Sequence, residues 1–108
     1  QQVPQLHLLS YCDLMITSGG MNSIAECIEK EVPMLVCPLS LKSDQLGNSA
    51  RVVYHGLGLR ARIKLDSSRT IEKRIVQLFE NYATFKRNLS MMRTKILAES
   101  TAINTEAI

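Results

Sequence analysis

The 108-residue sequence contains no tryptophan, and aromatic residues make up only 5% of it. Because single-stranded nucleic acids are held largely by aromatic side chains interleaved with cations, this shortage argues against nucleic acid as a partner. The longest apolar runs fall well short of the roughly 20 residues that span a membrane, and the opening residues QQVPQ show no signal peptide. We therefore expect a cytoplasmic protein that binds no nucleic acid.

Cysteine is scarce, and none of its spacings is typical of a metal site. Cys12, Cys27 and Cys37 stand among apolar residues, without a Cys-x-x-Cys motif or a paired cysteine and histidine motif. Small thiols in apolar surroundings are usually buried. We predict three reduced core thiols and no metal site.

The charge of the sequence is small in total but unevenly distributed. The net charge is +3, yet ten lysines and arginines fall between Arg60 and Lys95, against Asp66, Glu72 and Glu80. We interpret this basic region mainly as the solvated faces of two helices. Docking of the basic helices onto a partner or an anionic membrane surface is the less favoured alternative.

Short apolar runs alternate with amphipathic segments along the sequence. The predicted strands are Leu14–Thr17, Met34–Cys37 and Leu59–Ile63, the last at a sheet edge because arginines alternate with its apolar residues. The predicted helices are Pro4–Leu9, Asn22–Lys30, Gln45–His55 with Gly56 as its C-cap, Thr70–Asn81 and Phe85–Leu97.

This order predicts an α/β fold with a parallel, Rossmann-like sheet. Three strands are too few for a complete doubly wound domain, so we expect a half-domain in residues 1–98 and a frayed tail in residues 99–108. The absence of an initiating methionine fits a piece of a longer protein.

Gly19 and Gly20 separate the first predicted strand from the helix that follows it. Glycines let a phosphate approach the backbone, and the N–H groups at a helix N-terminus attract anions. The pair is also compatible with a simple tight turn. Glu26, about one helical turn further on, could accept hydrogen bonds from ribose hydroxyls, or it could form a capping box with Ser23. The spacing leaves these alternatives open.

Asp44 and Gln45 end the polar loop after the second predicted strand. The carboxyl ends of parallel strands meet at one edge of the sheet, and ligands of open α/β sheets bind there. A carboxylate and an amide at that edge suit sugar hydroxyls. Asp44 also suits the N-cap of the next helix, and both interpretations remain open.

Taken together, these residues resemble the donor-binding signature of the UDP-glycosyltransferases. The matching positions occur in the same order and nearly without gaps: Val3-Pro4-Gln5, Ser18-Gly19-Gly20-Met21-Asn22-Ser23, Glu26, Val32-Pro33-Met34, Pro38, Asp44-Gln45 and Asn48. The match covers roughly Gln2 to Leu59 and is most similar to bacterial macrolide-type members of glycosyltransferase family 1. It implies the C-terminal, donor-binding portion of a GT-B fold.

The resemblance also implies a role for each matching position. Val3 and Gln5 would lie along the nucleotide base, Ser18, Gly19, Gly20, Met21, Asn22 and Ser23 would hold the diphosphate, Glu26 would bind the ribose, and Asp44 and Gln45 would bind the donor sugar. The family usually has histidine where this chain has Ser18, so this position brings a hydroxyl group without a positive charge.

The activity that the resemblance implies is inverting, metal-independent transfer of a sugar from a nucleoside-diphosphate sugar to an acceptor hydroxyl. UDP is the expected nucleotide, and no cofactor is expected beside this co-substrate. The family's general base is a histidine of an N-terminal acceptor-binding domain, and neither His7 nor His55 matches it. We expect no catalytic residue in this fragment and no activity from it alone. The alternative is a non-catalytic nucleotide-sugar-binding subunit completed by a partner chain.

Overall fold

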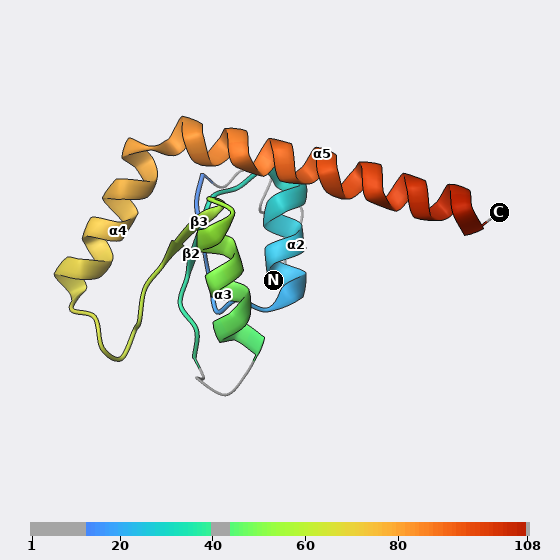
Figure 1. The fold of residues 1–108 in the computed structure, drawn as a ribbon. Helices are drawn as coiled ribbons and strands as arrows, with labels where there is room; N and C mark the ends of the chain where they lie inside the picture. The colour runs from blue at the N-terminus through green and yellow to red at the C-terminus, as the bar shows by residue number, and fades with distance from the viewer. Residues whose placement is uncertain (1–12, 40–43, 108) are drawn as a thin grey trace, which may run out of the picture.

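A computed structural model describes residues 13–39 and 44–107, and side chains up to residue 100. It confirms the α/β class (Figure 1). Strands β1 (Met15–Thr17), β2 (Met34–Val36) and β3 (Gly58–Arg60) form one parallel sheet in that order. The prediction of β3 as an edge strand is confirmed for this sheet, although the strand is shorter than expected. The predicted helix Pro4–Leu9 lies outside the described residues.

Within the part of the chain that the structure describes, four helices accompany the sheet: α2 (Met21–Lys30), α3 (Asp44–Tyr54), α4 (Ser68–Glu80) and α5 (Tyr82–Ala107). The first three agree with the predicted helices to within two residues. The prediction that the last helix ends at Leu97 is wrong, because α5 continues to Ala107 and its C-terminal part extends away from the sheet (Figure 1). The division between a domain and a tail at residue 98 stays a prediction.

The core has two clusters, one on each face of β2. Because successive side chains of a strand point to opposite faces, Met34 and Val36 enter the first cluster, while Leu35 and Cys37 enter the second. α2, α3 and α5 contribute to the first cluster, and α4 covers the second. All three residues of β2 are buried, as is typical of a parallel sheet covered on both faces.

The cysteines in the described part of the chain behave as core thiols. Cys27 and Cys37 are buried and form no disulfide within the described residues, which confirms the prediction for these two, and Cys12 lies outside the described residues. Burial raises the pKa of the Cys37 thiol, with a smaller contribution from the negative charge of Asp66. Both effects keep Cys37 protonated and unreactive.

Most of the basic residues between Arg60 and Lys95 occupy exposed positions, in line with solvated helix faces. Within residues 13–39 and 44–107, no helix combines the length and the hydrophobicity that crossing a membrane requires.

Glycine and asparagine join the end of α3 to α5. Gly56 has a left-handed backbone, with φ of 68°, and its N–H donates to the carbonyl of Val53 at 3.1 Å, which confirms the predicted C-cap. The side-chain amide of Asn88, in α5, donates to the Gly56 carbonyl at 3.0 Å. α5 therefore holds the end of α3 as well as packing against α2.

Candidate functional site

The structure brings the turn after β1 against the start of α3. A Cβ atom at Gly19 would lie 3.0 Å from Cγ1 of Val36 and 3.2 Å from the backbone oxygen of Gln45. This contact places the turn after β1 and the beginning of α3 at one edge of the sheet, where the parallel strands end. The sequence predicted this meeting of the two loops.

α2 begins directly after the glycine pair. Gly20 is the N-cap, with φ of −67° and ψ of 145°, and its carbonyl accepts the first helical hydrogen bond, from Ile24 N–H at 3.1 Å. The N–H groups of Met21, Asn22 and Ser23 therefore have no helical partner. A Cβ at Gly20 would meet no atom within 4 Å, so the backbone there is open to a ligand.

The capping box between Ser23 and Glu26 is wrong as an interpretation of this helix start. Gly20 occupies the N-cap position, and no side chain in the described part of the chain caps α2. Ser23 already lies inside the helix, as its third residue. The first turn therefore has N–H groups without a helical partner and the positive end of the helix dipole, and helix starts of this kind attract anions.

Asn48 fixes the glycine turn from the opposite side. Its side chain is only 6% exposed, and its amide Nδ2 donates to the Gly19 carbonyl at 3.0 Å. The Gly19 N–H donates to Oγ1 of Thr17 at 3.3 Å. Gly19 has φ of 96°, a conformation that side chains disfavour. The sequence placed Asn48 in the motif without a role, because its partner lies 29 residues away along the chain.

Replacing Asn48 with alanine is expected to cost about 1–3 kcal/mol of unfolding free energy, because it leaves the buried Gly19 carbonyl without its donor. The neighbouring variant Ser49→Ala is the control, since Oγ of Ser49 bonds within α3, to the Leu46 carbonyl at 2.7 Å. Denaturant unfolding measures stability, and binding of the nucleotide-sugar that the resemblance implies is measured alongside. Only Asn48→Ala should also weaken nucleotide-sugar binding. Equal effects of both variants on that binding would contradict a role of Asn48 in holding the turn.

Glu26 carries a polar atom that lacks a partner. The residue is half-buried, and its Oε2 is shielded from solvent without a hydrogen bond among the described residues. Buried oxygens in proteins are nearly always hydrogen-bonded, since leaving one unsatisfied costs free energy. An unsatisfied carboxylate oxygen, less than two turns from the start of α2, fits a group that bonds a ligand.

For the remaining predicted site residues, the structure describes only some of the residues or of their neighbours. Asp44 is exposed as the first residue of α3, and the N-cap position before it lies outside the described residues. Oε1 of Gln45 accepts from the N–H of Leu39 at 3.0 Å, which bridges the two ends of the loop between β2 and α3. Ser18 is half-buried directly after β1. Val3 and Gln5 lie outside the described residues.

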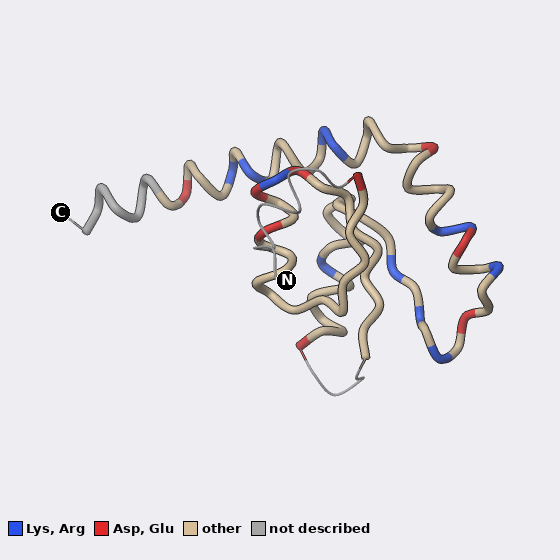
Figure 2. Tube along the Cα trace, turned by 180° about the vertical axis from the view of Figure 1, so that it is seen from behind, with Lys and Arg blue, Asp and Glu red and all other residues tan. Residues whose placement is uncertain are grey.

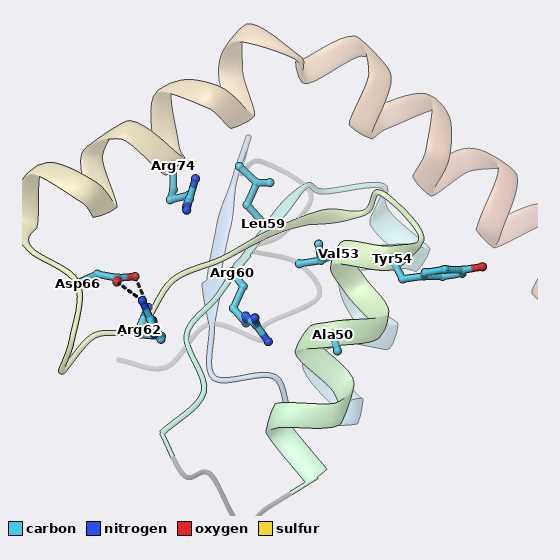
Figure 3. A pocket seen from close by; sticks show the side chains of 8 residues that line it. All are labelled: Ala50, Val53, Tyr54, Leu59, Arg60, Arg62, Asp66 and Arg74. Carbon is cyan, nitrogen blue, oxygen red and sulfur yellow. Dashed lines mark hydrogen bonds and ion pairs between the residues drawn. The ribbon is translucent and has the colours of Figure 1, made fainter.

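Among the described residues, two neighbouring hollows lie on the β3 side of the chain. One has a volume of about 740 Å³ and lies between α3 and α4 (Figure 3), and the other, of about 340 Å³, adjoins it. The predicted donor-site residues line neither of them. Among the described residues, no group of three or more histidine, cysteine or acidic side chains could hold a metal ion.

The sequence is similar to those of glycosyltransferases. Residues 5–105 match the model of the glycosyltransferase family 28 C-terminal domain. The zeaxanthin glucosyltransferase of Pantoea ananas is 34% identical over 88 residues, which cover 82% of this chain and 20% of that protein. Human UDP-glucuronosyltransferase 3A1 is 35% identical over 81 residues, covering 73% of this chain and 15% of that protein.

Solved structures of glycosyltransferases share the fold. The glycotransferase of kitacinnamycin superposes with a TM-score of 0.80 at 33% identity, covering 90% of this chain and 24% of that one. The spinosyn forosaminyltransferase SpnP gives a TM-score of 0.82 at 20% identity, over 91% and 26% of the two chains, and this second likeness shows the fold alone.

The parallel sheet and the helices that cover it thus have the fold of the C-terminal domains of GT-B glycosyltransferases. The chain belongs to the family of glycosyltransferase family 28 C-terminal domains. The predicted resemblance to the C-terminal part of glycosyltransferases is confirmed. The matching family model is that of family 28, whereas the sequence motif resembled family 1. The chain spans between 15% and 26% of the length of the relatives described above.

Proposed function

We propose that this chain is the donor-binding part of an inverting, metal-independent glycosyltransferase that moves a sugar from a nucleoside-diphosphate sugar, with UDP as the nucleotide, to an acceptor hydroxyl. An N-terminal acceptor-binding domain supplies the catalytic base, so the chain alone is inactive. The protein acts in the cytoplasm and uses no cofactor. Membership of a glycosyltransferase family supports the reaction class, and the unsatisfied Oε2 of Glu26 is the observation that carries the binding role.

The start of α2 holds the diphosphate in this proposal. The N–H groups of Met21, Asn22 and Ser23 have no helical partner, and Gly20 leaves room for phosphate oxygens beside them. Ser18 adds a hydroxyl donor from the end of β1. As the glycosidic bond breaks, negative charge develops on the diphosphate, and these fixed donors stabilise it in the transition state.

Glu26 and the pair Asp44 and Gln45 bind the two sugars of the donor. A carboxylate accepts hydrogen bonds from two ribose hydroxyls, which gives the buried oxygen of Glu26 its missing partner. Asp44, exposed at the start of α3, accepts from hydroxyls of the transferred sugar. Val3 and Gln5 line the base.

Replacing Asp44 with alanine is expected to lower kcat/KM for the nucleotide-sugar by about 10-fold to 100-fold, because about 1.5–3 kcal/mol of a charge-assisted hydrogen bond is lost. The affinity for UDP, which lacks the transferred sugar, should stay within about twofold. Steady-state kinetics and calorimetric titration of UDP on the intact protein separate the two effects. An equal loss of UDP affinity would contradict the assignment of Asp44 to the sugar.

A non-catalytic nucleotide-sugar-binding subunit, completed by a partner chain, is the alternative. The two proposals differ in one experiment. Purified protein from the complete reading frame either transfers sugar to an acceptor hydroxyl by itself, or it binds donor and transfers only when a separate chain is added.

A further inference from the structure

The larger hollow gathers positive charge around the sheet edge. Arg60 from β3, Arg62 from the following loop and Arg74 from α4 line it, with Asp66 as the only acidic residue among the described residues of the lining (Figure 3). Its volume of about 740 Å³ falls in the range of pockets that hold small ligands. Figure 2 shows basic residues following one another along β3 and the loop after it. None of these residues belongs to the proposed donor site.

The one carboxylate of the hollow is already engaged. Oδ1 of Asp66 lies 3.3 Å from Nη2 of Arg62, and Oδ2 accepts from the Arg62 backbone N–H at 2.7 Å. The backbone hydrogen bond, together with the charges of Arg62 and Arg74, lowers the pKa of Asp66, although partial desolvation opposes this. Asp66 therefore stays ionised at neutral pH and neutralises Arg62.

The other two guanidinium groups leave the hollow with an excess of positive charge. Nη1 of Arg74 donates to the neutral amide oxygen of Gln77 at 3.1 Å, and its charge acts on Asp66, which Arg62 already binds. Arg60 has no hydrogen-bonded or ionic partner among the described residues. Both guanidinium groups line the hollow, one from a strand and one from a helix, and neither forms a salt bridge among the described residues. Such planar, forked donors bind phosphate oxygens.

We propose that this hollow is a second anion site, in which Arg60 and Arg74 hold a phosphate group of a ligand other than the sugar donor. The phosphate belongs either to a soluble phosphate ester or to a lipid headgroup. The second source has a structural basis, because the adjoining hollow shares Arg60 and Arg62 and presents the apolar side chains of Leu39, Ile63 and Leu65. Leu65 is 73% exposed and Ile63 is 53% exposed.

The simpler explanation of these arginines is protection of the sheet edge. Charged side chains on an edge strand discourage pairing with another chain, and such residues need no ligand. This explanation accounts for Arg60 on β3. It gives no reason for Arg74, which comes from α4 and faces the same hollow.

The test is calorimetric titration of inorganic pyrophosphate into the intact protein saturated with UDP, which keeps the donor site occupied. The double variant Arg60→Gln and Arg74→Gln is expected to weaken pyrophosphate binding at least about tenfold, since two charge-assisted contacts are lost. The matched control removes the same charge outside the hollow, with Arg69→Gln and Arg87→Gln, and should stay within about twofold. If the double variant does not fold, the single variant Arg74→Gln replaces it in the titration.

A second arm distinguishes the source of the phosphate. Vesicles of phosphatidylglycerol with phosphatidylcholine are sedimented with the intact protein and compared with phosphatidylcholine vesicles. If the ligand is a headgroup, anionic vesicles bind the protein, and both the arginine double variant and Leu65→Ser reduce this binding. If it is a soluble ester, Leu65→Ser leaves pyrophosphate binding unchanged and no vesicle binds.

The proposal is overturned if neither probe binds, if UDP abolishes pyrophosphate binding, or if the control double variant loses as much affinity as the arginine variant. If UDP abolishes pyrophosphate binding, all phosphate binding takes place at the donor site. Because UDP binding is measured separately, a failure of this inference leaves the proposed donor function standing.

Discussion

Replacing Glu26 with alanine is expected to lower kcat/KM for the nucleotide-sugar donor by about 100-fold or more in the intact protein. Two charge-assisted hydrogen bonds to ribose hydroxyls are lost, each worth about 1.5–3 kcal/mol, and every 1.4 kcal/mol corresponds to about tenfold. Steady-state kinetics with varied donor measures the loss. UDP affinity should fall in parallel, because the ribose belongs to the nucleotide.

The same substitution should leave the free protein as stable as before, or raise its unfolding free energy by about 1 kcal/mol. Oε2 of Glu26 is buried without a partner, so removing it relieves an unsatisfied group. This combination of lost activity and retained stability distinguishes a ligand-binding carboxylate from a structural one. Denaturant unfolding without donor checks it.

Glu29 provides the matched control on the same helix. It is an exposed carboxylate three residues further along α2. Glu29→Ala removes the same charge near the same helix and should change neither donor kinetics nor stability beyond about 0.5 kcal/mol. Comparable losses of activity in both variants would falsify the assignment of the ribose to Glu26 and point to a general effect of charge.

Replacing Gly58 with alanine is expected to destabilise the fold by about 3 kcal/mol or more. Gly58 begins β3 and pairs with Met34 of the central strand. A Cβ atom there would overlap the carbonyl oxygen of Met34 and lie 2.8 Å from its carbonyl carbon. Since the obstacle is backbone rather than a flexible side chain, the two strands have to move apart.

Gly47→Ala is the control for this prediction. Gly47 lies inside α3, and a Cβ there would meet no atom of the described residues within 4 Å. Alanine is the better helix former by about 0.8–1 kcal/mol, so this variant should be more stable than the parent. Thermal and denaturant unfolding of both variants measures the contrast. A Gly58→Ala protein as stable as the parent would show that β3 does not approach β2 this closely.

Much of the fold followed from local patterns. The apolar runs of β1 and β2, the helical periodicity of α2 to α4 and the left-handed cap at Gly56 were all visible in the sequence, because each depends on residues close together in the chain. The extent of α5 was not, since its hydrophobic periodicity is weak and its end carries no glycine or proline signal.

The site divides in the same way. The sequence by itself determined the order of the glycine turn, Glu26 and the Asp44-Gln45 pair, because their types and spacings carry the resemblance to glycosyltransferases. Only the tertiary structure decided that Gly20 caps α2 in place of a side chain and that Asn48 holds Gly19. Only it showed that Arg74 of α4 and Arg60 of β3 line the same hollow. The contact of Asn48 with Gly19 and the shared hollow of Arg60 and Arg74 depend on residues more than ten positions apart, which meet only when the helices pack on the sheet. The N-cap of α2 depends on packing as well, because several neighbouring residues could begin the helix.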